Sequence, residues 1–220
     1  MGNNMFQRFS FLLSCLALSC GVSAGTLDFA KLPPAEWILP LQAKGQSAEA
    51  GAAGGRAALK VEWNCAEARW FSFNLKRSPR LPEFEQAEFS LQLFRPQGST
   101  VRRTSLLLAD RDSEVFQLTT PLPAGAGGWM QVNFSFHSKA VKANIWGGKK
   151  KNRIPDFPLR IVGVTCSYAA TQGIESAALG QLEWRLTPAA GPSSPPKPGR
   201  ELVDFSTLLD SEINPRLGGK

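Results

Sequence analysis

The sequence predicts an all-β fold, a β-sandwich of two antiparallel sheets between residues 25 and 187. Three observations lead to this prediction. Many short segments are rich in Val, Phe, Leu and Trp, and Gly, Pro, Asp and Ser separate them. Apolar and polar residues alternate within the segments, as they do in a strand that buries one face. A sustained helical period is absent from the sequence.

The strand-like segments follow one another along the whole domain. They are Ala57–Cys65, Ala68–Leu75, Glu88–Phe94, Thr104–Ala109, Val115–Leu118, Trp129–His137, Leu159–Tyr168 and Leu179–Leu186. Two stretches between them are predicted to be loops. One is Gly45–Gly55, which is rich in Ala and Gly, and the other is Pro121–Gly128.

Alternation assigns each strand a buried face and a polar face. The rows expected in the core are Leu59, Val61 and Trp63; Phe71, Phe73 and Leu75; Phe89, Leu91 and Leu93; and Val132, Phe134 and Phe136. The opposite phase is polar and holds Trp70, Ser72 and Asn74; Ser90 and Gln92; and Gln131, Asn133, Ser135 and His137. Leu159–Cys166 is apolar in both phases, which predicts a central strand.

The N-terminus predicts an exported protein. A short start whose only charge is Arg8, the apolar run Phe9–Leu18 and the small residues Val22–Ala24 form the pattern of a signal peptide over residues 1–24. The apolar run is too short to span a bilayer. Cys20 lies in an imperfect lipoprotein-like box, so a lipid anchor at this residue is an alternative. The expected location is secreted, periplasmic or on the cell surface of a bacterium.

The composition of the C-terminal region predicts a linker, which a further domain could follow. Residues 188–200 are rich in Pro, Gly and Ser, which is the composition of a linker. In the tail, residues 201–220, Leu202–Leu208 repeats the pattern of Thr26–Leu32 near the expected mature start. The tail is either disordered or the beginning of a further domain, and we favour a longer multidomain protein.

Charge and cysteine content limit the partners and the chemistry. The chain has a formal net charge of +7, but its basic residues are scattered, apart from Lys149–Lys151 and Arg153. In an exported protein this run predicts a solvated loop or a contact with an acidic polysaccharide or anionic surface, and nucleic acid is not expected. Cys65 and Cys166 remain after signal removal, and they are either a disulfide or two buried thiols.

Six short motifs, in this order, resemble those of a known domain type. They are Leu27-Asp28-Phe29; Ala58–Trp63; Phe89–Phe94; Leu108–Phe116; Gly128–Val132; and Trp146-Gly147-Gly148 followed by Asp156–Leu159. The region resembles the galactose-binding-like jelly-roll domains found as carbohydrate-binding modules, often at the N-terminus of secreted bacterial glycoside hydrolases. The resemblance implies a jelly-roll sandwich, a polysaccharide ligand and an attached glycoside hydrolase.

The same resemblance raises the question of a structural calcium ion. Related modules often hold one between an acid near the N-terminus and an acid on the last strand, and Asp28 and Glu183 are the candidates here. The sequence departs from the pattern at two places. Lys149–Lys151 replace acidic residues, and Gln181–Trp184 replaces paired aspartates. Because Ca²⁺ needs six to eight oxygens, ion-paired or solvated acids are the competing interpretation.

A sugar-binding site needs an aromatic platform beside amide or charged groups. Trp70 on a polar strand phase and Trp146 in a Gly-rich stretch are the candidate platforms, although each could instead cover an edge of the core. The candidate hydrogen-bonding groups are Asn74, Gln92, Asn133 and His137, which would form a row if their strands were neighbours. Trp63 and Trp129 are expected to be structural, and Trp184 is ambiguous.

The residues give little support for catalysis. His137 is the only histidine, and Asp110, Asp112 and Glu114 occupy a predicted hairpin turn. The first functional hypothesis is therefore a non-catalytic polysaccharide-binding module of a larger glycoside hydrolase-like protein. The alternatives are a small secreted β-sandwich enzyme, a glucanase or lyase, and a surface structural or adhesion domain.

Overall fold

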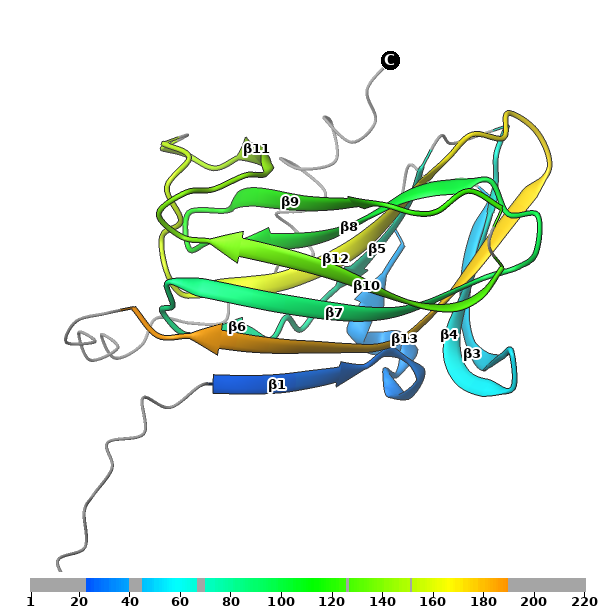
Figure 1. Cartoon of the computed structure of the whole chain (residues 1–220), viewed down its shortest axis with the longest axis horizontal. Coiled ribbons are helices and arrows are strands. Elements are labelled where there is room, and N and C mark those ends of the chain that lie inside the picture. The colour runs from blue at the N-terminus through cyan, green and yellow to red at the C-terminus, as the bar shows by residue number, and fades with distance from the viewer. Residues whose placement is uncertain (1–22, 40–44, 67–69, 126, 151, 190–220) are drawn as a thin grey trace, which may run out of the picture.

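Two antiparallel β-sheets pack face to face and form the domain (Figure 1). The structure is a computed structural model that describes residues 23–39, 45–66, 70–125, 127–150 and 152–189. Within these ranges the only helical elements are two short 3₁₀ turns, η1 (Phe29–Lys31) and η2 (Pro34–Glu36). None of the described helical segments is long and apolar enough to span a membrane.

The six-stranded sheet, called sheet A here, has the order β10-β7-β13-β4-β3, and β1 also pairs with β13. Strand β13 pairs with β4 through its first half, with β1 through its second half and with β7 along its other edge. The strands are β1 (Ser23–Asp28), β3 (Gln46–Ala53), β4 (Arg56–Asn64), β7 (Gln86–Arg95), β10 (Gly128–His137) and β13 (Ile174–Thr187).

The seven-stranded sheet, called sheet B here, has the order β11-β9-β8-β12-β5-β2, and β6 also pairs with β12. Strand β12 lies between β8 and β5, so the prediction that Leu159–Cys166 is a central strand is confirmed. The strands are β2 (Trp37–Ile38), β5 (Trp70–Leu75), β6 (Arg80–Leu81), β8 (Val101–Ala109), β9 (Glu114–Pro121), β11 (Asn144–Gly147) and β12 (Leu159–Tyr168).

Each strand predicted from alternation has a counterpart, and one predicted loop is wrong. The residues from Gln46 to Ala53, expected in a loop, form β3, which pairs along its whole length with β4. Ala and Gly have low strand propensity, but backbone pairing with an established neighbour overrides it. The predictions for residues 1–22 and for most of the linker and tail, from residue 190 on, lie outside the described residues.

The core between the sheets consists of the alternating rows expected from the sequence. All members of the four rows are buried, with exposed fractions of at most 3%. Aromatic rings from both sheets contact one another there: Trp63 of sheet A stacks on Phe71 of sheet B with ring centres 5.1 Å apart. Phe136 of β10 similarly meets Phe116 of β9 edge to face. The two inner faces therefore form one continuous core.

Trp184, whose role was ambiguous from the sequence, is partly buried and packs against the core on the inner side of sheet A, in phase with Leu182 and Leu186. A Cβ atom on Gly25 of β1 would collide with its indole ring. The ring therefore lies directly over β1, and glycine at position 25 leaves the space for it. This places Trp184 in a structural role at the β1–β13 pair.

Candidate functional site

The predicted site residues fall on two opposite faces of the sandwich. Trp70, Asn74 and Trp146 belong to sheet B, on β5 and β11. Gln92, Asn133 and His137 belong to sheet A, on β7 and β10. A single row of all the amides is therefore excluded, because the core separates the two sets.

The register of sheet B aligns mostly polar residues from three, four or five neighbouring strands into rows on its outer face. We call these residues the polar face. One row runs Trp70, Ser167, Arg103; the next runs Ser72, Thr165, Ser105, Thr119; the third runs Asn74, Gly163, Leu107, Gln117, Asn144. The residues between them in each strand, such as Phe71, Phe73 and Leu106, point into the core. Sequence alternation placed Trp70, Ser72 and Asn74 on an outer face, but the other members come from strands whose neighbours the sequence does not specify.

Hydrogen bonds between side chains fix part of the polar face. The hydroxyls of Ser105 and Thr119 are 2.9 Å apart, and Gln117 Nε2 donates to Ser105 Oγ at 3.0 Å. Asn144 Nδ2 donates to Gln117 Oε1 at 3.4 Å, which extends the chain to the edge strand β11. Hydroxyl and amide groups keep further donor and acceptor capacity after one such bond. The face is thus ordered. Ser72, Ser105 and Thr165 are buried in its floor, with exposed fractions of at most 6%, so a ligand would meet the open groups of Ser167, Gln117 and Thr119.

Asn74 departs from the prediction of a solvent-facing amide. Its side chain is 2% exposed, and Ser72 Oγ donates to its Oδ1 at 3.5 Å. A Cβ atom at Gly163 of β12 would come within 2.7 Å of the same oxygen. The amide therefore packs against the glycine backbone in the floor of the face, where the backbone of β12 leaves room for it.

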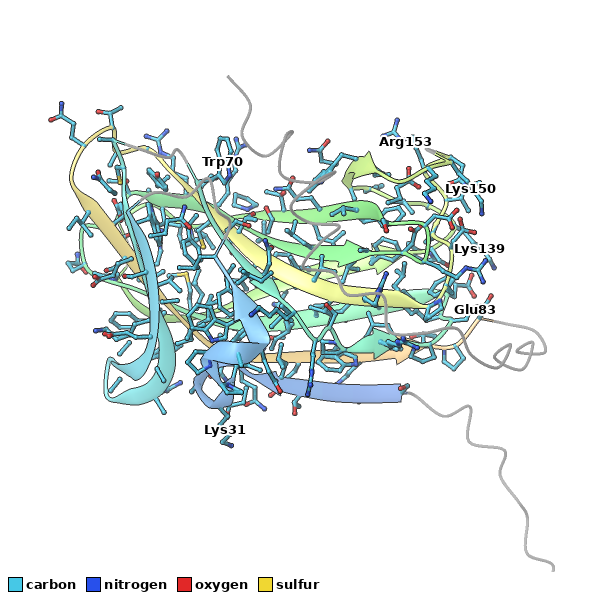
Figure 2. The ribbon with its side chains drawn as sticks, turned by 180° about the vertical axis from the view of Figure 1, so that it is seen from behind. Lys31, Trp70, Glu83, Lys139, Lys150 and Arg153 are labelled. Atoms are coloured by element: carbon cyan, nitrogen blue, oxygen red, sulfur yellow. The ribbon has the colours of Figure 1, made fainter. Side chains whose placement is uncertain are left out.

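Trp70 is the partly exposed aromatic residue at one end of the polar face. Figure 2 shows it toward the opposite end of the sandwich from the loop that carries Lys150 and Arg153. It is the first residue of β5, directly across from Ser167. Its position meets the requirement for an aromatic platform that borders hydroxyl and guanidinium groups.

Trp146 was expected in an open, Gly-rich loop, but the structure places it in β11. It is 9% exposed and packs with Leu107, Ala109, Val115 and Val162 into a small apolar cluster on the outer face of sheet B. The following glycines, at φ +75° and +70°, lie against the β8–β9 turn, where a side chain would meet Ser113 O or Glu114. The indole therefore forms a wall beside the polar face and offers little open ring surface.

The sheet A candidates are brought together on neighbouring strands. Gln92 lies across from Gln131, Asn133 from Ser90 and His137 from Gln86. Asn133 and His137 are exposed, and Gln92 is partly buried. The partly buried Trp129 at the start of β10 is structural, as expected, since its Nε1 donates to Ala53 O at 2.9 Å and its ring meets Phe94 at 5.5 Å.

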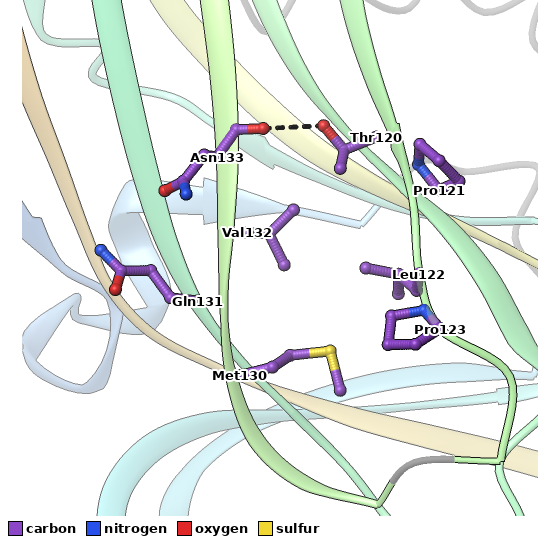
Figure 3. A pocket seen from close by; sticks show the side chains of 8 residues that line it. All are labelled: Thr120, Pro121, Leu122, Pro123, Met130, Gln131, Val132 and Asn133. Carbon is purple, nitrogen blue, oxygen red and sulfur yellow. Dashed lines mark hydrogen bonds between the residues drawn. The ribbon is translucent and has the colours of Figure 1, made fainter.

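A shallow groove of about 300 Å³ runs between β9 and β10, where the edges of the two sheets meet (Figure 3). Thr120 Oγ1 donates to Asn133 O at 2.8 Å across it. The lining is mostly apolar: Pro121, Leu122, Pro123, Met130 and Val132, with Thr120, Gln131 and Asn133 as the polar members. Few polar side chains converge in this groove, which makes it a poorer match to a sugar than the polar face.

The acidic residues of the β8–β9 turn are structural, as predicted. Asp110 is fully buried and accepts hydrogen bonds from the backbone N–H groups of Asp112, Glu114 and Asp156 at 2.9, 2.8 and 3.2 Å. Both carboxylate oxygens of Glu114 accept from Arg153 N. Burial raises the pKa of Asp110 and of Glu114. Their oxygens hold the turn and the following loop, so neither acid faces a substrate.

The basic run next to this turn is partly neutralised. Lys150 Nζ forms ion pairs with Asp112 at 2.8 Å and with Asp156 at 3.1 Å. Hydrogen bonding to the Lys150 ammonium lowers the pKa of Asp112. The run therefore supports the loop conformation at least through Lys150.

The candidate calcium ligands do not fit a calcium ion. Asp28 caps η1 by accepting from Ala30 N at 3.1 Å with Oδ1, and its Oδ2 pairs with Lys31 at 3.0 Å. Glu183 is exposed and lies across from Thr26, two positions from Asp28 in the register. Asp28 is thus already paired with Lys31, and the described residues contain no cluster of three side chains that could hold a metal ion. Asp28 therefore has a capping role.

Cys65 and Cys166 are free thiols, and both are buried. Cys65 follows β4 and donates its backbone N–H to Gly173 O, whereas Cys166 lies on β12 and contacts Thr104 Oγ1 at 3.6 Å. Burial raises the pKa of both thiols, to about 11 for Cys166. The disulfide alternative is therefore absent from the structure, and both side chains act as small apolar groups.

Comparison with solved structures shows the same architecture. The family 11 carbohydrate-binding module of the cellulosomal cellulase Lic26A-Cel5E of Clostridium thermocellum aligns with a TM-score of 0.52 at 10% identity, over 74% of this chain and 95% of that module. The fold is that of a carbohydrate-binding module. A family 11 module from the same organism, in complex with a β-1,3-1,4-mixed-linked tetrasaccharide, aligns with a TM-score of 0.53 at 10% identity, over 74% and 96%. No family model matches the sequence, and no curated protein is similar to it.

The carbohydrate-binding-module fold confirms the jelly-roll expected from the sequence motifs. At 10% sequence identity these similarities do not identify the ligand of this chain. Proteins that share a fold can differ in the residues that bind a ligand. What this chain binds must be inferred from its own side chains.

Proposed function

We propose that this domain is a non-catalytic polysaccharide-binding module, and that the sugar lies on the polar face of sheet B. The observation that carries the proposal is the row of Trp70, Ser167 and Arg103, an aromatic ring, a hydroxyl and a guanidinium on three adjacent strands. Strands in a sheet are about 4.8 Å apart, so the row spans about 10 Å, a length suited to a sugar ring with its substituents.

The chemistry of the face matches that of a sugar. The apolar C–H face of a pyranose stacks on an indole, and its hydroxyls exchange hydrogen bonds with amide and hydroxyl groups. Gln117 and Thr119 supply such groups, and hydrogen bonds to the buried Ser105 hydroxyl already hold both of them. Ordering them in advance lowers the entropy lost on binding.

The Trp70→Ala variant should lose affinity for the bound polysaccharide by about tenfold or more, because the stacking partner is removed. Titration calorimetry with soluble glycans and pull-down with insoluble ones measure the loss, using purified residues 25–187. Trp146→Ala should weaken binding indirectly and lower the melting temperature, since its ring is packed on sheet B.

Trp129→Ala is the matched control, a partly buried tryptophan on the opposite sheet. It should leave affinity unchanged in whatever fraction remains folded by circular dichroism. Equal affinity of folded Trp70→Ala and wild type would refute the polar face as the site. Absence of binding to every glycan in the panel would refute the module itself.

We also propose that the module belongs to a larger exported glycoside hydrolase-like protein and holds it near its substrate by raising the effective concentration. The Pro-rich composition of residues 188–200 and the repeated Leu202–Leu208 pattern support this proposal. An antibody against residues 25–187 should detect an exported species heavier than 23.9 kDa. A species confined to the cytoplasm would contradict export, and one no heavier than 23.9 kDa would contradict the larger protein.

A further inference from the structure

Charge is divided unequally between the two sheets. The strands of sheet B carry four arginines, Arg80, Arg102, Arg103 and Arg160, and one acidic residue, Glu114. The strands of sheet A carry more acids than bases: Asp28, Glu49, Glu62, Glu88, Glu175 and Glu183 against Arg56, Lys60, Arg95 and Arg185. The positive excess among the strands thus lies on the sheet that bears the polar face.

The single acid of sheet B does not offset its arginines. Glu114 is 3% exposed, and both of its oxygens accept from Arg153 N at the far end of β9. Burial raises its pKa. The outer face of sheet B therefore presents positive charge without an exposed strand carboxylate.

Two of the arginines lie at opposite ends of this face. Arg103 is exposed and lies one strand beyond Ser167 from Trp70. Arg80 is exposed and lies directly across from Arg160 on β12. Arg160 and Ser167 are separated by about 23 Å along the strand at about 3.3 Å per residue. A ligand that follows β12 would meet positive charge at both ends of the polar face.

Arg80 and Arg160 place two like charges across from each other on adjacent strands. Like charges directly opposite each other on adjacent strands destabilise a sheet. Arg160 is anchored by donating from its NH2 group to Asp110 O at 3.3 Å, while Arg80 remains exposed. An anionic group bound between these strands would offset the repulsion, since guanidinium groups bind carboxylates and sulfates through paired hydrogen bonds.

Three lysines on or near sheet A are ion-paired. Lys31, Lys60 and Lys139 each form an ion pair with a neighbouring carboxylate at 3.0 to 3.2 Å. Among the described residues, Arg80 and Arg103 have no such ion pair. The guanidinium groups of Arg80 and Arg103, both exposed, can therefore pair with an external anion.

We infer that the polar face binds an anionic polysaccharide, one that carries carboxylate or sulfate groups, with Trp70 stacking on a ring and Arg103 pairing with an adjacent anionic group. This inference rests on the proposed function and assigns its ligand class. Arg80 and Arg160 provide a second anion contact farther along the chain. Neutral glycans lack the groups that would use these arginines.

The test measures affinity of residues 25–187 for four polymers: polygalacturonate, a sulfated galactan, a neutral mixed-linkage β-glucan and poly-glutamate. We expect one anionic glycan to bind at least about tenfold more tightly than the neutral one, and to weaken as salt rises from about 0.1 to about 1 M. Tighter binding of polygalacturonate would indicate a carboxylate ligand, and tighter binding of the sulfated galactan would indicate a sulfate ligand.

Arg103→Gln should weaken binding of that glycan by about tenfold and abolish most of its preference over the neutral glucan. Arg185→Gln is the matched control, because it removes the same charge from an exposed position on sheet A. It should change affinity less than twofold. Melting temperatures of both variants establish that the fold is intact.

Three outcomes would overturn the inference. Equal binding of neutral and anionic glycans, unaffected by Arg103→Gln, would leave a polysaccharide module with a neutral ligand. Binding of poly-glutamate as tightly as the anionic glycan would show attraction by charge alone. No binding of any glycan would remove the proposed function together with its ligand class.

Discussion

The Trp63→Ala variant should lower the free energy of unfolding by about 3–5 kcal/mol, the range typical of removing a buried tryptophan. Trp63 on β4 is fully buried, stacks on Phe71 at 5.1 Å and lies 5.4 Å from Tyr168. Both partners belong to sheet B, so this ring joins the two sheets. Urea denaturation followed by circular dichroism measures the loss.

Trp63→Phe is the control for ring volume. It keeps an aromatic ring between the sheets and removes a buried Nε1 that has no hydrogen-bond partner among the described residues. We expect it to cost less than half of the alanine effect. A loss below about 1 kcal/mol for Trp63→Ala would show that the neighbouring side chains collapse into the space, and that the ring does not join the sheets.

The core could be predicted from the sequence because the alternation of apolar and polar residues within each strand shows which side chains are buried. In Leu59, Val61 and Trp63, or Phe89, Leu91 and Leu93, the alternation alone shows which side chains face inward. This information does not depend on which strands are neighbours. The prediction of the core is therefore correct even though some strand boundaries differ and β3 was predicted to be a loop.

The candidate site could be predicted only in part, because it depends on sheet membership. Trp70 was assigned correctly to an outer face, but Gln92 and Asn133 proved to lie on the other sheet. Arg103, Ser167 and Gln117 were missed, since nothing within their own strands shows that β8, β12 and β9 adjoin β5 or one another. Non-local pairing is the information that a single sequence lacks.

Local composition led to a wrong prediction at Trp146. The glycines after it suggest a loop and an exposed ring, yet their positive φ angles allow a close approach to the β8–β9 turn. The ring is buried as a result. Glycine after an aromatic residue can indicate tight packing as well as an open turn.

The same non-local pairing explains how the binding face is kept in shape. Ser167 and Arg103 are held by the β12–β8 ladder, whose end carries a register shift between Ser167 and Tyr168. The segment that follows is tied to the β7–β8 connection by Ala169 N donating to Thr100 O at 3.1 Å and Ala170 N donating to Thr100 Oγ1 at 2.9 Å. Thr100 is in turn fixed by Glu175, so a buried carboxylate supports the edge of the proposed site.

The Glu175→Ala variant should therefore lower the free energy of unfolding by about 3 kcal/mol. Glu175 is 8% exposed, and its carboxylate accepts hydrogen bonds from Ser99 Oγ at 2.9 Å, Thr100 N at 2.8 Å and Thr100 Oγ1. Alanine leaves these donors without their acceptor. Chemical denaturation measures the stability, and glycan affinity should also fall, because the strand end that carries Ser167 and Arg103 is loosened.

Glu183→Ala on the same strand removes an exposed carboxylate and serves as the matched control, with an expected change within about 0.5 kcal/mol. Glu175→Gln should be intermediate, because its single amide oxygen can replace only part of the carboxylate. Equal stability of the Glu175 and Glu183 alanine variants would show that water replaces the lost acceptor. The network would then contribute nothing to the edge of the polar face, and its arginine and tryptophan would be held by the strand ladder alone.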